Sequence, residues 1–196
     1  MTADNKMDDG RADLLRCALA LLEERGHESL SIRRVSELAG LSSGAPYYHF
    51  TDRRALLLGL ALEGFTQLEM LANGVLTAGA DSRQALQELA AVFLVFNDSH
   101  PHLMDLMYES ELTRPIDPAL EPSYRRAFEM VVGVIGNINP GSDRKTVLVR
   151  AVTFWTSLFG LSRLLRQRLL EPFHDEIEGS WRDAVLKEMV DMAATG

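Results

Sequence analysis

The residues best suited to chemistry in this chain lie close together, between Ser31 and Phe50. Hydroxyl, guanidinium, phenol and imidazole groups recur in this short stretch beside a glycine-containing turn. Side chains of these kinds donate hydrogen bonds to phosphate oxygens and to the edges of bases. The stretch is therefore the first candidate for a surface that contacts DNA.

The spacing of residues in this stretch predicts two short helices joined by a turn. Ser31 is a suitable N-cap for the first helix, Gly40 suits the left-handed backbone of a tight turn, and Ser42 can cap the second helix. The buried face of the first helix follows from apolar residues at one-turn spacing: Ile32, Val35 and Ala39. The pattern predicts a helix-turn-helix.

The flanking segments supply the rest of a three-helix DNA-binding domain. An amphipathic helix precedes the motif and ends at Gly26. Its apolar stripe is Leu15, Ala18, Leu19 and Leu22. Downstream, Asp52 is a suitable N-cap for a long apolar helix that runs towards Gly74.

Composition restricts the class of protein. The chain has 196 residues, 46% of them hydrophobic, and a single cysteine, which argues against a disulfide framework. No unbroken apolar run approaches the about 20 residues of a membrane helix, and residues 1–10 lack the layout of a secretory signal. We expect a cytoplasmic protein that does not contact a membrane.

The formal net charge of −8 is unevenly distributed. Residues 29–60 hold four arginines against two acidic side chains, whereas acidic residues outnumber basic ones after residue 60. A locally basic motif on an otherwise acidic chain is consistent with one region contacting phosphates.

Several motifs in fixed order resemble the TetR family of bacterial transcriptional regulators. They are the Ala-Leu-x-Leu-Leu-x-x-x-Gly of Ala18 to Gly26, Ala39-Gly40-Leu41-Ser42, Gly44, Tyr47, His49-Phe50, and Asp52-Arg53 followed by Leu56. The resemblance is strongest over residues 12–60 and implies a repressor that a small molecule releases from DNA. It predicts an all-α fold of about nine helices, with a helix-turn-helix domain at 1–52 and a helical effector-binding and dimerisation domain at 53–196.

The resemblance also implies which residues contact the DNA. Arg33 would bond a guanine edge, although Arg34 stays an alternative, and the second helix would open with short side chains that read bases weakly. Tyr47, His49 and Arg53 would contact phosphates, and a phosphate could offset the unfavourable position of Arg54 in the first turn of its helix. The full predicted set is Ser31, Arg33, Ser42, Ser43, Ala45, Tyr47, His49, Arg53 and Arg54. We expect Tyr48 and Phe50 to face the core.

A helix near the C-terminus carries a two-sided apolar pattern that predicts self-association. Apolar residues recur along it at alternating three- and four-residue steps, and a final helix follows Pro172. Two such helices from each of two subunits would form a four-helix interface about a two-fold axis, which is also how the resembled family dimerises. The predicted interface residues are Ala151, Phe154, Leu158, Leu161, Leu165, Trp181, Val185 and Met189. A homodimer would place two recognition helices about 34 Å apart and require a nearly palindromic operator.

The resemblance further implies an effector pocket, and aromatic and methionine side chains are its candidate lining. They are Phe65, Leu68, Phe93, Phe96, Met104, Met107, Tyr108, Phe128, Phe154 and Trp155. Each of them could instead fill the core.

No residue pattern in the sequence compels an enzyme, a cofactor or a metal site. His100 and His102 flank a proline that begins a helix, so we expect a solvated helix entrance rather than a pair of metal ligands. The alternative to a regulator is a helical small-molecule-binding or scaffold protein with a vestigial DNA motif.

Overall fold

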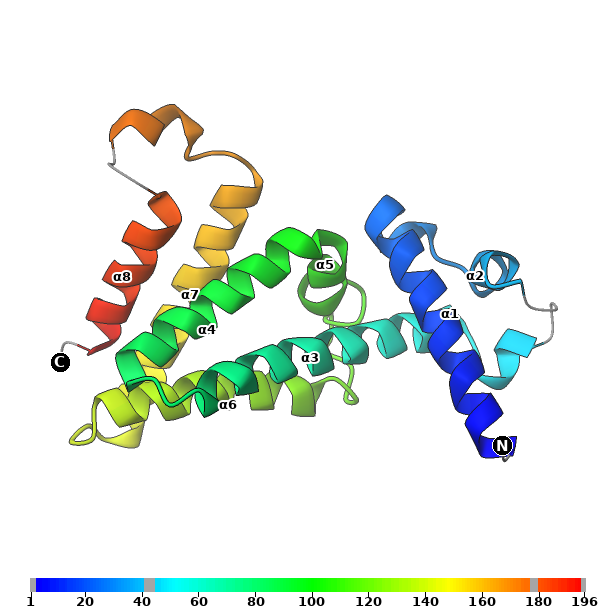
Figure 1. The fold of residues 1–196 in the computed structure, drawn as a ribbon, viewed down its shortest axis with the longest axis horizontal. Helices are drawn as coiled ribbons and strands as arrows, with labels where there is room; N and C mark the ends of the chain where they lie inside the picture. Colours follow the sequence, from blue (N-terminus) through cyan, green and yellow to red (C-terminus); the bar gives the residue numbers. More distant parts are fainter. Residues whose placement is uncertain (1–2, 41–44, 177–179, 195–196) are drawn as a thin grey trace. The chain divides into compact units, whose positions relative to one another are not determined.

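Helices build the fold of this protein. The computed structural model describes residues 3–40, 45–176 and 180–194. Within these ranges there are eight α-helices, three short 3₁₀ helices and no strand, which confirms the predicted all-α class. In chain order (Figure 1) they are α1 (Ala3–Arg25), η1 (His27–Ser29), α2 (Ile32–Leu38), η2 (Ala45–Tyr48), α3 (Arg53–Thr77), α4 (Ser82–Ser99), α5 (Pro101–Glu109), α6 (Glu121–Ile138), α7 (Arg144–Arg166), η3 (Glu171–Glu176) and α8 (Trp181–Ala194).

The predicted caps set where these helices begin. The side chain of Ser31 accepts a hydrogen bond from the backbone N–H of Arg34 at 3.2 Å, and Asp52 accepts one from Ala55 at 2.8 Å. Asp143, which the sequence analysis did not predict as a cap, accepts a hydrogen bond from the N–H of Thr146 at 2.7 Å at the start of α7. Each carboxylate or hydroxyl satisfies a backbone donor that has no partner within its helix.

The described chain divides into two compact units that do not follow the predicted boundary after residue 52. Unit 1 comprises residues up to 67 together with 100–123, and unit 2 comprises residues 68–99 and those from 124 onwards. The expected boundary lies inside unit 1, because this unit also includes α3 as far as Gln67 and α5, which packs on α1.

In unit 2, α7 and α8 form an antiparallel hairpin beside α4 (Figure 1). The predicted interface residues Ala151, Phe154, Leu158, Leu161 and Met189 are at most 4% exposed within the single chain. A side chain that its own chain already buries has no surface left for a second subunit. The pattern correctly indicated a helix seam, but assigning these five residues to a subunit interface was wrong.

Two helices of the described chain, α3 and α7, are long and apolar enough to cross a membrane by length and composition alone. Scattered polar residues interrupt both helices, so neither contains an unbroken apolar run of that length. Core helices of soluble proteins can be equally long and apolar. In this fold 50% of the most apolar stretch of α3 is buried, whereas 33% of the corresponding stretch of α7 is buried. The small buried share on α7 leaves an apolar face on its surface.

Candidate nucleic-acid interface

The outer surface of α2 carries the clearest candidates for contact with DNA. Ser31, Arg33, Arg34, Glu37 and Leu38 line an open depression of about 560 Å³. The Arg33 side chain is 87% exposed, and its Nε donates to Glu37 Oε1 at 2.9 Å. An exposed pair of this kind contributes little to stability, so the guanidinium of Arg33 is available to a stronger acceptor such as a base edge or a phosphate.

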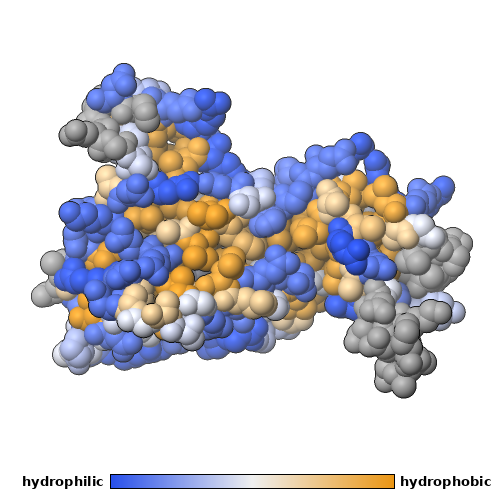
Figure 2. All heavy atoms as spheres, in the orientation of Figure 1, coloured by the Kyte–Doolittle hydropathy of each residue, from blue (hydrophilic) through white to orange (hydrophobic). Residues whose placement is uncertain are grey.

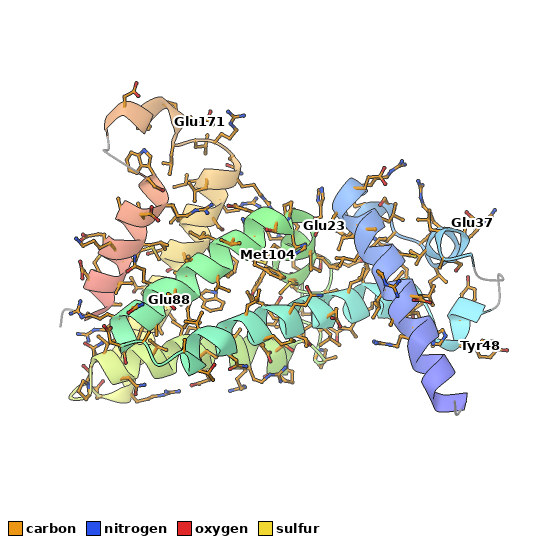
Figure 3. The ribbon with its side chains drawn as sticks, viewed as in Figure 1. Glu23, Glu37, Tyr48, Glu88, Met104 and Glu171 are labelled. Carbon is orange, nitrogen blue, oxygen red and sulfur yellow. The ribbon has the colours of Figure 1, made fainter. Side chains whose placement is uncertain are left out.

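The second helix of the motif is η2, a 3₁₀ helix whose two tyrosines are exposed. Tyr47 is 56% exposed and Tyr48 is 85% exposed, and Tyr48 projects away from the ribbon (Figure 3). The expectation that Tyr48 faces the core was wrong, because a 3₁₀ helix has a different period and ends at this residue. Phe50 is buried as predicted, with the guanidinium of Arg11 over its ring at 5.5 Å.

The structure describes only some of the other residues that were predicted on this helix. Ala45 is the first residue of η2, whereas Ser42 and Ser43 lie outside the described residues. His49 is partly exposed, and its ring lies so close to Gly10 of α1 that a Cβ added there would be 3.0 Å from His49 Nε2. Contact between these residues and DNA stays a prediction.

Arg53 binds its own chain. Its Nε donates to the carbonyl of Leu30 at 2.9 Å, its Nη2 donates to the carbonyl of His27 at 2.8 Å, and its Nη1 pairs with Glu111. The guanidinium thereby joins the start of α3 to the turn between α1 and α2. Three of the five N–H donors of this guanidinium thus bind acceptors within the chain, which gives Arg53 a structural role. Its contact with a phosphate stays a prediction.

Arg54 is also engaged within unit 1. Its Nη2 donates to Asp117 Oδ2 at 2.6 Å. The pKa of Asp117 is lowered mainly by the hydrogen bond from the backbone N–H of Ala119. The hydrogen bond from Arg54 lowers it further. The carboxylate of Asp117, rather than a phosphate, therefore offsets the cation in the first turn of α3.

Two close contacts attach α5 to the other helices of unit 1. The Glu23 carboxylate of α1 accepts hydrogen bonds from the backbone N–H groups of His102 at 3.3 Å and Leu103 at 3.1 Å, which lie in the first turn of α5 (Figure 3). On α3, a Cβ added at Gly64 would lie 2.6 Å from Met107 Sδ. Glutamate and glycine are therefore required here by their partners on α5.

The predicted effector-lining residues fall into two groups. Phe65, Met104, Met107 and Tyr108 belong to unit 1, where the rings of Phe65 and Tyr108 meet edge to face at 5.5 Å. Leu68, Phe93, Phe96, Phe128, Phe154 and Trp155 belong to unit 2. Phe154 lines a groove between α7 and α8, so it faces a different neighbour from Trp155.

Four aromatic rings form a connected group in unit 2, which we call the aromatic cluster: Phe93, Phe128, Trp155 and Phe159. Trp155 contacts the other three, with ring centroids 5.8 to 6.3 Å apart. Phe159 was absent from the predicted lining, although its position one helical turn after Trp155 would have indicated it.

Among the residues that the structure describes, no three His, Cys, Asp or Glu side chains are grouped as a metal would require. His100 Nδ1 lies 3.8 Å from Glu23 Oε1, beside the N-terminus of α5.

An N-terminal three-helix unit with an exposed α2 and η2, followed by an all-helical remainder, defines a helix-turn-helix protein of the regulator class. Residues 14–60 match the family model described as bacterial regulatory proteins of the tetR family, and residues 86–187 match the tetracyclin repressor-like C-terminal domain. The chain belongs to the TetR family, whose members are transcriptional regulators rather than enzymes.

Curated relatives share mainly the N-terminal part. The transcriptional repressor AcnR of Corynebacterium glutamicum is 36% identical over 63 residues, which is 32% of this chain and 34% of that protein. The transcriptional repressor KstR2 of Mycobacterium tuberculosis H37Rv is 27% identical over 111 residues, 56% of this chain and 54% of that protein. The matches thus span about a third to a half of the length of these relatives.

Solved structures share the fold over nearly the whole chain. A Rhodococcus protein of unknown function superposes with a TM-score of 0.80 at 24% identity and covers 94% of this chain and 93% of its own. A tetracycline repressor variant from Acinetobacter baumannii in complex with minocycline superposes with a TM-score of 0.57 at 21% identity, covering 92% of both chains.

Proposed function

We propose that this protein is a cytoplasmic, homodimeric repressor that binds a palindromic DNA operator and leaves it when an apolar small molecule binds. The observation that carries the proposal is the exposed set of Ser31, the N-cap of α2, Arg33 on α2 and Tyr47 on η2, within the part of the chain that matches the family model. A guanidinium, a hydroxyl and a phenol on one short motif suit base and phosphate contact.

An exposed stripe on α7 supports the dimer. Val149, Thr153, Thr156 and Gly160, which we call the α7 stripe, recur at four- and three-residue steps opposite the buried seam. The hydroxyl of Thr153 donates to the Val149 carbonyl at 3.0 Å, and that of Thr156 donates to the Val152 carbonyl at 2.7 Å. Because these hydroxyls are satisfied by their own helix, the threonines add methyl groups to the stripe.

The neighbouring face of α8 extends this surface. Met192 is 49% exposed and lines, with Val149 and Thr153, a groove of about 250 Å³ between α7 and α8. Apolar side chains reach the surface along this hairpin on the face shown in Figure 2. We place the subunit interface on the α7 stripe with Val185 and Met192, and keep Trp181 and Leu165, both partly exposed, at its edge.

For the effector, we place the binding surface at the aromatic cluster of unit 2. Aromatic rings offer an adaptable apolar surface, and a ligand that binds the DNA-free conformation more tightly lowers operator affinity by that difference. The alternative, a helical binding or scaffold protein with a vestigial motif, predicts no sequence-specific DNA binding.

DNA selection tests the regulator. The purified protein is used to select fragments from a random-sequence pool, and we expect enrichment of an inverted repeat with half-sites about 34 Å apart. Replacement of Arg33 and Tyr47 by alanine should abolish enrichment, whereas Arg125→Ala at an exposed position of α6 should not. Failure of the unmodified protein to enrich any sequence at low salt would refute the proposal and favour the scaffold.

The dimer has its own test. Gly160→Arg places a long cation on the α7 stripe, where an added Cβ meets nothing within 4 Å in the single chain. We expect a folded monomer by analytical ultracentrifugation, with Lys145→Ala as a control that stays dimeric. A dimeric Gly160→Arg variant would place the interface elsewhere.

A further inference from the structure

A buried amide without a partner lies one helical turn beyond the aromatic cluster. Asn97 of α4 is 5% exposed, and its side-chain nitrogen has no hydrogen-bond partner. A buried donor left unpaired costs on the order of 1–3 kcal/mol, so native proteins keep few of them. Such a donor calls for an acceptor that comes from outside the chain.

The aromatic cluster occupies the same face of α4 as Asn97. Phe93 precedes Asn97 by four residues, so their side chains are neighbours along the helix. Phe93 is buried and meets Phe159 of α7 with ring centroids 5.0 Å apart.

The cluster is open to a ligand at three of its four rings. Phe128, Trp155 and Phe159 remain partly exposed, whereas Phe93 and Asn97 are buried. The arrangement places apolar, partly accessible rings outside and a polar donor inside. Pockets for small molecules combine apolar walls with a few polar groups that fix orientation in this way.

We propose that Asn97 is the polar anchor of the effector site, donating from Nδ2 to a carbonyl-type oxygen of a flat aromatic ligand that packs on Phe93, Trp155 and Phe159. This inference rests on the proposed function, because it gives the effector of that repressor a chemical class. The rings select a planar apolar body, and the amide donor selects one acceptor on it. An aromatic hydrocarbon of equal size satisfies the rings but leaves the amide unpaired.

A matched pair of probes tests the anchor. 2-Acetylnaphthalene and 2-ethylnaphthalene have nearly the same shape, but only the ketone carries an acceptor. The chain has two tryptophans, so a Trp181→Phe background makes Trp155 in the cluster the sole indole reporter. Fluorescence quenching gives the affinity for each probe, and we expect the ketone to bind on the order of tenfold more tightly.

Substitution of the anchor should remove the preference and keep the site. Asn97→Leu, in the same background, should bind the two probes with equal affinity. It should fold at least as well as the parent, since it removes an unpaired buried donor. Asn73→Leu, an exposed position on α3, is the matched control and should keep the preference of about tenfold.

The outcomes separate this inference from the proposed function. Absence of quenching by both probes, equal affinity in the parent, or a preference that survives Asn97→Leu would each overturn the anchor. DNA selection is an independent readout, carried out with both tryptophans in place, and Asn97→Leu should still enrich the inverted repeat. Loss of DNA selection in the unmodified protein would instead overturn the repressor, whatever the probes show.

Discussion

Unit 1 and unit 2 join their helices by different means. In unit 1, charged side chains reach from one element to the backbone of another, as Arg53 does to the carbonyls of His27 and Leu30, and as Glu23 does to the first turn of α5. In unit 2, the buried seam of α7 packs against α4 and α8, and ion pairs such as Arg83 with Asp191 lie at the exposed ends.

This difference matters for a protein proposed to switch. A hydrogen bond between side chain and backbone depends on distance and angle, so a small displacement weakens it steeply. A packed seam tolerates little displacement, because interiors are as dense as organic crystals. The polar links of unit 1 are therefore better suited to change between two states than the seam of unit 2. Five substitutions test this contrast.

The largest expected effect is in the seam of unit 2. Leu158→Ala should lower the free energy of unfolding by about 3 kcal/mol, because it removes buried apolar contacts and leaves a cavity. Urea denaturation measures the loss, which should be the same across protein concentrations if the seam lies within one chain. Val152→Ala, 51% exposed, should change stability by less than about 0.5 kcal/mol. If the loss of stability occurred only at low protein concentration, Leu158 would belong to a subunit interface.

The next effect is at the clamp of unit 1. Arg53→Ala should cost about 2–3 kcal/mol, because it leaves two backbone carbonyls without their charged donor. Chemical denaturation measures it, with Lys187→Ala at an exposed position of α8 as the neutral control. If Arg53→Ala instead kept its stability and lost only DNA affinity, Arg53 would be a phosphate contact after all.

A smaller effect is expected where α3 and α5 approach closely. Gly64→Ala should cost about 1–2 kcal/mol, because its Cβ would overlap Met107 Sδ and press on Leu103. Gly74→Ala on the same helix meets nothing within 4 Å and should instead stabilise by up to about 1 kcal/mol through helix propensity. Thermal unfolding of both variants measures the two changes in stability. If both changes had the same sign, the close approach of Gly64 to Met107 would be contradicted.

The helix cap from Glu23 should contribute about 1 kcal/mol. In Glu23→Ala, the backbone N–H groups of His102 and Leu103 lose their acceptor. Hydrogen exchange should therefore quicken at these two amides while the amides of α7 are unchanged. Unchanged protection at Leu103 would show that the carboxylate is not needed to attach α5.

The smallest effect depends on pH. The pKa of Asp117 is lowered in the folded protein, so its contribution to stability is complete above the ordinary pKa of an aspartate. The contribution is lost as the pH falls through the lower folded value. Asp117→Asn should cost less than about 1 kcal/mol at neutral pH and reduce the acid sensitivity of unfolding, measured by thermal melts from pH 3 to 7. An unaltered pH profile would contradict a role for Asp117.

Local patterns predicted much of the fold and of the DNA-binding motif. Ser31 and Asp52 act at helix starts, and Gly26 and Gly40 adopt the left-handed backbone at φ +76° and +66°. These features depend on neighbours within a few residues, so the chain itself carries the information. The motifs from Ala18 to Leu56 were likewise sufficient to place the chain in its family.

The tertiary structure decided what each surface side chain faces. Arg53 and Arg54 looked like free cations, yet partners at residues 27, 30, 111 and 117 bind them. The α7 pattern predicted a buried seam but could not show whether the same chain or a second one covers it. Apolar periodicity reports that a face is buried, and only the packing of distant segments determines which segment covers it.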